Sequence, residues 1–159
     1  MLGPLLFVIY INDLDENIGG MVSKFADDTK IGGIVDSEEN YLQLQRDLAQ
    51  LGQWADEWQM EFNLDKCEVM HFGRLKQGRT YSVNGRALGR VTEQRDLGVH
   101  IHSYLKEESQ VDSVLKKAFG MLGFIGQTNE YMSWNVLLKL YKTLARPHLE
   151  YCVQFWSPY

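Results

Sequence analysis

Two adjacent carboxylates, Asp27 and Asp28, are the residues of this sequence best suited to chemistry. They stand between two short apolar runs, and two like charges held in a partly buried turn need a compensating cation. Mg²⁺ is the natural candidate, because it takes a few carboxylate oxygens together with phosphate and water ligands. The simpler alternative is an ordinary solvent-exposed turn, in which aspartate side chains bond to the backbone.

Two histidine and cysteine pairs offer a second possible metal site. Cys67-x3-His71 and His148-x3-Cys152 would together supply four zinc ligands. Neither pair has the short Cys-x2-Cys spacing of a zinc knuckle, so two buried cysteines are the alternative. Two cysteines this far apart do not form the disulfide framework of a small secreted domain, and reduced thiols are expected.

Charge is divided unevenly along the chain. Residues 1–65 carry three Lys and Arg against thirteen Asp and Glu, whereas residues 66–159 carry thirteen against eight. An acidic half with metal ligands and a basic half facing phosphates would suit an enzyme that acts on nucleic acid, although solvated helix faces also explain the pattern. Only Glu93 opposes the basic residues of the segment 74–95, which are Arg74, Lys76, Arg79, Arg86, Arg90 and Arg95.

The elements that must position the carboxylates begin with a helix. It is expected to start near Pro4, since proline is tolerated in a first turn, and to end near Ile18 as a buried element, apolar on all sides. The runs Met21–Phe25 and Thr29–Val35 then predict a hairpin with the two acids at its tip.

A long amphipathic helix is predicted next. Asp36-x-x-Glu39 provides a capping box, and the apolar positions that follow recur at spacings of three and four. They are Leu44, Leu48, Leu51, Trp54, Ala55 and Trp58.

Strands and then helices are predicted for the rest of the chain. Asn84-Gly85 is a strong type I′ turn signal and predicts a hairpin of Thr80–Val83 with Ala87–Val91. Further strands are expected over Glu68–Phe72 and Asp96–Ile101. Two helices follow, the first packing Val111, Val114, Leu115, Ala118, Phe119, Leu122 and Ile125, the second running from Trp134 to a stop at Pro147. The fold class is therefore α+β, with a helical region after the sheet.

No membrane segment is expected. The longest apolar stretch, Leu5 to Ile11, is far shorter than the roughly 20 residues that a spanning helix needs, and no secretory leader precedes it. We expect an intracellular protein, cytoplasmic or nuclear.

Taken in order, the motifs of this chain resemble the reverse transcriptases of LINE-type (non-LTR) retrotransposons, with jockey and chicken-repeat elements most similar. The resemblance covers essentially the whole chain. It rests on Gly3-Pro4-Leu5-Leu6-Phe7, Tyr10-Ile11-Asn12-Asp13-Leu14, Phe25-Ala26-Asp27-Asp28-Thr29-Lys30, Trp54-x3-Trp58, Phe62-Asn63-x2-Lys66-Cys67, Phe72-Gly73, Leu97-Gly98-Val99, Arg146-Pro147-His148-Leu149-Glu150-Tyr151-Cys152 and Trp156-Ser157-Pro158-Tyr159.

This resemblance implies a partial polymerase palm over residues 1–104 and a helical thumb-like region over 105–159. The parent reaction would add deoxynucleotides to a DNA 3′ hydroxyl on an RNA template, with Mg²⁺ or Mn²⁺ as the metal. Its partners would be RNA template, DNA primer and deoxynucleoside triphosphate.

The resemblance also implies roles for single residues. Asp27 would be the principal metal ligand and Asp28 its weaker neighbour, while Phe25 and Ala26 would place the turn against the primer end. Lys66 would protonate the departing pyrophosphate, unless it is an ordinary surface lysine. Leu97, Gly98 and Val99 would grip the primer, although a strand glycine also marks bulges. Arg74, Lys76, Arg79, Arg86 and Arg90 would contact nucleic-acid phosphates.

A palm site of this class needs a third carboxylate, from a strand that precedes Gly3-Pro4. We expect this chain to begin after that strand, to expose sheet edges and apolar surface, and not to polymerise by itself. The alternatives are a non-catalytic RNA- or protein-binding module and an untranslated relic.

Overall fold

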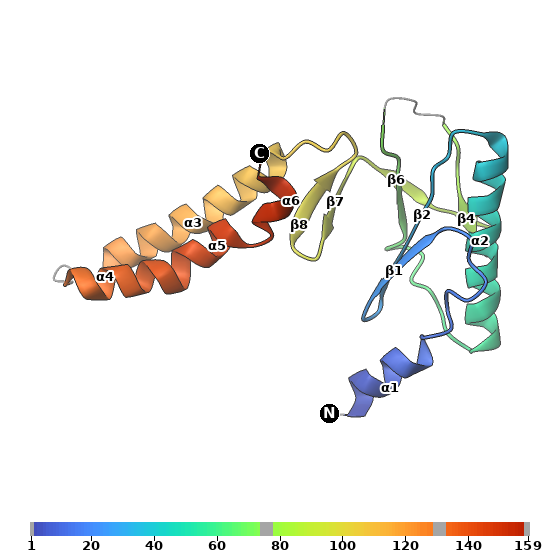
Figure 1. Ribbon diagram of the computed structural model, residues 1–159, viewed down its shortest axis with the longest axis horizontal. Coiled ribbons are helices and arrows are strands. Elements are labelled where there is room, and N and C mark those ends of the chain that lie inside the picture. The colour runs from blue at the N-terminus through green and yellow to red at the C-terminus, as the bar shows by residue number, and fades with distance from the viewer. Residues whose placement is uncertain (1, 74–77, 129–132, 158–159) are drawn as a thin grey trace. The chain divides into compact units, whose positions relative to one another are not determined.

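A computed structural model describes residues 2–73, 78–128 and 133–157. The chain divides into two compact units, shown in Figure 1. Unit 1 comprises Met1–Val69 and Gln77–Arg90, and unit 2 comprises Met70–Lys76 and Val91–Tyr159.

Unit 1 begins with the helix α1 (Leu2–Tyr10), and residues 11–17 follow it as turns. The predicted helix was therefore too long, and the prediction that it is buried was wrong. None of its residues is buried, whereas Ile11 and Leu14 directly after it are 7% and 5% exposed. The apolar sequence of α1 forms a helix, but little of the described chain covers it.

The strands β1 (Met21–Phe25) and β2 (Asp28–Gly32) form the predicted antiparallel hairpin. Its register pairs Met21 with Gly32 and Phe25 with Asp28, which leaves a loop of two residues. The acids lie at the tip, as predicted.

The long helix α2 (Glu38–Glu57) confirms the predicted amphipathic helix. Its N-cap is Ser37, whose hydroxyl accepts the backbone N–H of Asn40 at 3.2 Å, so the capping box predicted at Asp36 was wrong by one position. Leu51 and Ala55 are buried, whereas Trp58 caps the C-terminus and is 40% exposed.

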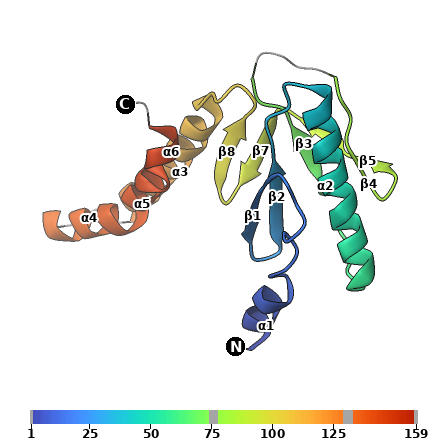
Figure 2. The ribbon, with the colours of Figure 1, turned by 45° about the vertical axis from the view of Figure 1, so that its right-hand side comes forward.

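The Asn84-Gly85 hairpin is confirmed. Strands β4 (Ser82–Val83) and β5 (Arg86–Ala87) pair across it, and both turn residues have positive φ, as type I′ requires. Figures 1 and 2 both show β4 beside α2. The strands β3 (Glu68–Met70) and β6 (Gly89–Val91) form another two-stranded sheet.

Unit 2 contains a hairpin where the sequence predicted a single strand. The strands β7 (Glu93–Asp96) and β8 (Val99–His102) pair antiparallel around Leu97-Gly98, so the strand predicted over 96–101 was wrong. Both turn residues have positive φ, 45° for Leu97 and 88° for Gly98. Leucine rarely adopts this conformation, so the residue type at position 97 did not indicate a turn.

The helices of unit 2 form a hairpin of their own, which Figure 2 shows from a second side. The helix α3 (Glu108–Thr128) packs against a nearly continuous helical run, and buries Val114, Ala118 and Ile125. Leu115, Phe119 and Leu122, which the sequence placed on the packed face, are at least 40% exposed.

Pro147 does not end the second helical run, contrary to the prediction. The run consists of α4 (Trp134–Leu140), the π-helix η1 (Tyr141–Ala145) and α5 (Arg146–Glu150), and a short α6 (Val153–Trp156) follows. Pro147 lies in the first turn of α5, directly after the π-helix η1, at a position in an α-helix where proline is tolerated.

The described residues mix helices with small antiparallel sheets, which agrees with the α+β class. Within them, no helix is both long enough and apolar enough to cross a membrane.

Candidate functional site

The Asp27-Asp28 pair lies at the tip of the β1–β2 hairpin. Ala26 and Asp27 form the two-residue loop, and Asp28 opens β2 opposite Phe25. Both carboxylates are exposed, so the expectation of a partly buried turn was wrong. In the described chain neither of them forms an ion pair, and both are open to a cation shared with a phosphate ligand.

The backbone and side chains next to the pair are also exposed. Ala26 has a φ of 51°, a left-handed conformation that costs a non-glycine residue roughly 1–2 kcal/mol. The side chain of Phe25 is 60% exposed, and its role in contacting the primer stays a prediction. The tip therefore presents an aromatic ring and two carboxylates to solvent.

A buried carboxylate on α2 fixes the start of the hairpin. Asp47 is fully buried and accepts the backbone N–H groups of Gly19, at 3.2 Å, and of Gly20, at 2.9 Å. The side-chain amide of Gln43 donates a third hydrogen bond to it at 2.9 Å. A Cβ on Gly20 would lie only 3.0 Å from the carbonyl oxygen of Gly32, so this approach requires glycine.

Lys24 of β1 connects the hairpin with the turns that follow α1. Its ammonium group donates to the carbonyl oxygens of Ile11, at 3.3 Å, and Asn12, at 2.8 Å, and to the carboxylate of Asp15 at 2.5 Å. This hydrogen bond from Lys24 lowers the pKa of Asp15 below its usual value. Lys24 is thus a structural cation of unit 1.

Lys66 lies in a turn of unit 1, with its side chain exposed and its backbone N–H bonded to the carbonyl of Asn63 at 3.0 Å. No hydrogen bond or ion pair of the described residues joins it to Asp27 or Asp28. Its role in protonating pyrophosphate stays a prediction.

Neither expected metal site is complete. Over 2–73, 78–128 and 133–157 no three His, Cys, Asp or Glu side chains gather around one point, so the four-ligand zinc alternative is not supported. Burial also raises the pKa of the Cys67 thiol, which disfavours the thiolate that zinc binds. The Asp27-Asp28 pair supplies two carboxylates and fits a weakly held Mg²⁺.

The residues predicted to grip the primer form the turn of the β7–β8 hairpin in unit 2. Leu97 is 44% exposed at the tip, whereas Val99 is buried and serves the core. The hydroxyl group of Tyr151 donates to the carbonyl of Leu97 at 2.7 Å, and a Cβ on Gly98 would lie 3.4 Å from the Tyr151 ring. Gly98 thus permits a close approach between this turn and the segment after α5.

The residues predicted to bind phosphate differ in the ion pairs and hydrogen bonds that they already form. Arg79 pairs with Glu38 at 3.1 Å, donates to the carbonyl of Ser37 at 2.7 Å and stacks on the Tyr41 ring, so it supports the N-terminus of α2. Arg86 pairs with Asp65. Arg90 is exposed without an ion pair in the described chain, and Arg74 and Lys76 lie outside the described residues.

Sequence reasoning missed the residues that hold the site rather than form it. Asp47 was not singled out because an aspartate on an amphipathic helix normally faces solvent. The pair Gly19-Gly20 was interpreted only as a break before the strand. The backbone N–H groups of both glycines in fact donate hydrogen bonds to the buried carboxylate of Asp47.

Comparison with known proteins gives the following matches. The family model described as "Reverse transcriptase (RNA-dependent DNA polymerase)" matches residues 1–125. The RNA-directed DNA polymerase from mobile element jockey of Drosophila melanogaster is 21% identical over 175 aligned residues, which include 99% of this chain. The chain spans only 19% of the length of that relative. No solved structure matches the chain significantly.

Proposed function

Since the chain belongs to the reverse transcriptase (RNA-dependent DNA polymerase) family, and resembles in particular the LINE-type retrotransposon enzymes, we propose that it contributes part of a polymerase palm and thumb. The palm part would be residues 1–104 and the thumb part residues 105–159. The reaction of the whole enzyme would be template-directed addition of deoxynucleotides to a DNA 3′ hydroxyl, with RNA template and DNA primer as partners.

One observation carries this proposal. This chain, a member of the family, presents two adjacent, exposed and unpaired carboxylates, Asp27 and Asp28, at the tip of a hairpin with a two-residue loop. These carboxylates would hold Mg²⁺, or Mn²⁺ in its place, with Asp27 as the principal ligand. When bound, the metal would supply charge that activates the primer hydroxyl and stabilises pyrophosphate. Phe25 and Ala26 would face the primer end, and Lys66 would donate a proton to the pyrophosphate.

Metal binding tests the role of the two carboxylates directly. Mn²⁺ titrated into the 159-residue chain should bind weakly, and its electron paramagnetic resonance signal should report a bound fraction. Asp27→Asn should lower that fraction more than Asp28→Asn. Asp56→Asn removes the same charge from an exposed position of α2 and should leave the bound fraction of Mn²⁺ unchanged. Equal binding by all three variants would refute the site.

Primer extension tests activity separately. We propose that the isolated chain does not polymerise, because no third carboxylate of the described residues lies beside Asp27 and Asp28. The purified chain, an RNA template and a labelled DNA primer should therefore give no extended product with Mg²⁺ or Mn²⁺. Incorporation that disappears in Asp27→Asn would overturn the proposed inactivity and leave the metal site intact.

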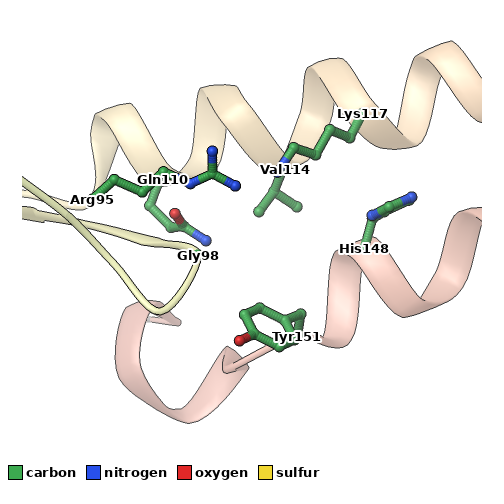
Figure 3. Close-up of a pocket in the computed structure, with 7 residues that line it drawn as sticks. All are labelled: Arg95, Gly98, Gln110, Val114, Lys117, His148 and Tyr151. Atoms are coloured by element: carbon green, nitrogen blue, oxygen red, sulfur yellow. The ribbon is translucent and has the colours of Figure 1, made fainter. Parts of the chain in front are cut away.

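A non-catalytic role in nucleic-acid binding is the second candidate. It is favoured by Arg95 and Lys117 of unit 2 (Figure 3), which form no ion pair among the described residues. RNA binding that depends steeply on salt, but is unchanged by EDTA and by Asp27→Asn, would support this second role.

A further inference from the structure

The outer edge of β1, in the hairpin of unit 1 (Figure 1), is a strand edge without a neighbour in the described chain. Within the described residues β1 pairs with β2 alone. The two-residue loop makes Phe25 and Asp28 a hydrogen-bonded pair, and such pairs alternate along an antiparallel ladder. The backbone N–H and C=O groups of Val22 and Lys24 therefore point away from β2. No backbone hydrogen bond among the described residues uses these four groups.

The side chains on the exposed face of β1 carry no charge. Met21, Ser23 and Phe25 alternate along this face, and Met21 and Phe25 are 71% and 60% exposed. The one charged residue of β1, Lys24, is on the other face, where its ammonium group bonds to Asp15. An edge strand of this kind accepts another strand readily, because no charge on its exposed face opposes the approach.

The strand β2 has the protection that β1 lacks. Its exposed face carries Asp28 and Lys30, and Gly32 ends the strand. Charged side chains, lysine above all, are the usual means by which proteins prevent a further strand from joining a sheet edge, and glycine weakens a strand. A strand added to this hairpin would therefore pair with β1.

A second copy of β1 fits this edge in an antiparallel register centred on Ser23. Met21 then lies opposite Phe25 of the second copy, twice over, and a thioether beside an aromatic ring is a favourable contact. Val22 and Lys24 of the two copies exchange four backbone hydrogen bonds. The contact is self-complementary, as a twofold dimer requires. The acidic hairpin tips lie about 25 Å apart, beyond the roughly 8 Å screening length of physiological salt.

We propose that two copies of this chain pair edge to edge through β1, antiparallel about Ser23, and so form a four-stranded sheet in the order β2, β1, β1, β2. Two strands alone are marginally stable in water, whereas a sheet of three or more strands with an apolar face is stable, so the pairing strengthens each hairpin. The proposal goes beyond the polymerase assignment, because it requires neither metal nor nucleic acid.

Cross-linking at the twofold axis tests the register. In a chain with Cys67→Ala and Cys152→Ala, Ser23→Cys places two thiols on the axis, where the Cα atoms of a non-hydrogen-bonded pair lie about 4.5 Å apart, within reach of a disulfide. Mild oxidation should then give a covalent dimer. Lys30→Cys is the matched control, because Lys30 lies opposite Ser23 on the same exposed face but on β2, and it should give little dimer. Equal cross-linking of the two variants, or more at Lys30→Cys, refutes the pairing.

Sedimentation equilibrium of the full chain measures the strength of the pairing. Ser23→Lys should weaken the dimer roughly two- to fivefold, because it places like charges opposite one another on the axis. Ser23→Thr adds no charge and favours a strand, so it should keep the dimer or strengthen it. The proposal fails if Ser23→Lys associates as the parent chain does while circular dichroism shows an unchanged fold. It also fails if the parent chain stays monomeric, in which case the edge would suit a strand of another protein.

Discussion

At the scale of single residues, Asp47 is the side chain that holds the start of the hairpin carrying Asp27 and Asp28. It is the one charged side chain that the described residues bury, and its three hydrogen-bond donors come from Gly19, Gly20 and Gln43. A carboxylate without positive charge beside it tolerates burial only when such donors satisfy it. The glycine pair before β1 and the middle of α2 are therefore coupled by electrostatics as well as by packing.

Asp47→Asn should destabilise unit 1 by about 2 kcal/mol, because an amide NH₂ would face a backbone N–H that needs an acceptor. Urea unfolding followed by circular dichroism at 222 nm measures this change. Asp56→Asn, on the exposed surface of the same helix, should stay within about 0.5 kcal/mol of the parent chain. Equal effects of the two substitutions would mean that the carboxylate of Asp47 is not needed in its buried position.

At the scale of elements, the parts that could be predicted from sequence are those whose signals are local. The hairpin at Asp27 follows from short β-compatible runs flanked by glycine pairs, the type I′ turn follows from Asn84-Gly85, and α2 follows from its periodicity. The turn at Leu97-Gly98 could not be predicted in this way, because leucine opposes the conformation that tertiary contacts impose on it. Tyr151, more than fifty residues later in the chain, makes one of those contacts.

The two turns allow a direct comparison, since Asn84-Gly85 has φ values of 49° and 77° and Leu97-Gly98 has 45° and 88°. Leu97→Asn should therefore stabilise unit 2 by about 1 kcal/mol, because asparagine tolerates the left-handed region far better than leucine. The reciprocal change Asn84→Leu should destabilise unit 1 by at least as much. Thermal unfolding of both variants measures the difference. A loss of stability in Leu97→Asn would show that the exposed leucine packs more than its turn conformation costs.

At the scale of the whole molecule, the two units bury little apolar surface for a chain of this size. The helix α1 has no buried residue, and its leucines, valine and isoleucine are more than half exposed. The apolar residues Phe119, Phe124 and Trp134 of unit 2 are also more than half exposed. The expectation of exposed apolar surface is thus confirmed for the described residues, and exposed apolar surface promotes association.

The exposed apolar residues of α1 should therefore contribute to self-association of the isolated chain more than to its free energy of unfolding. Leu5 and Ile9 are four residues apart, so they share a helix face, and they are 59% and 63% exposed. The double substitution Leu5→Gln and Ile9→Gln should reduce concentration-dependent sedimentation, while the midpoint of urea unfolding changes little. Leu14→Gln, only 5% exposed, should instead destabilise unit 1 by about 3 kcal/mol, because it buries an amide where a side chain is packed. If the double variant lowers the unfolding midpoint as much as Leu14→Gln does, then α1 is covered in solution by contacts that the described residues do not make.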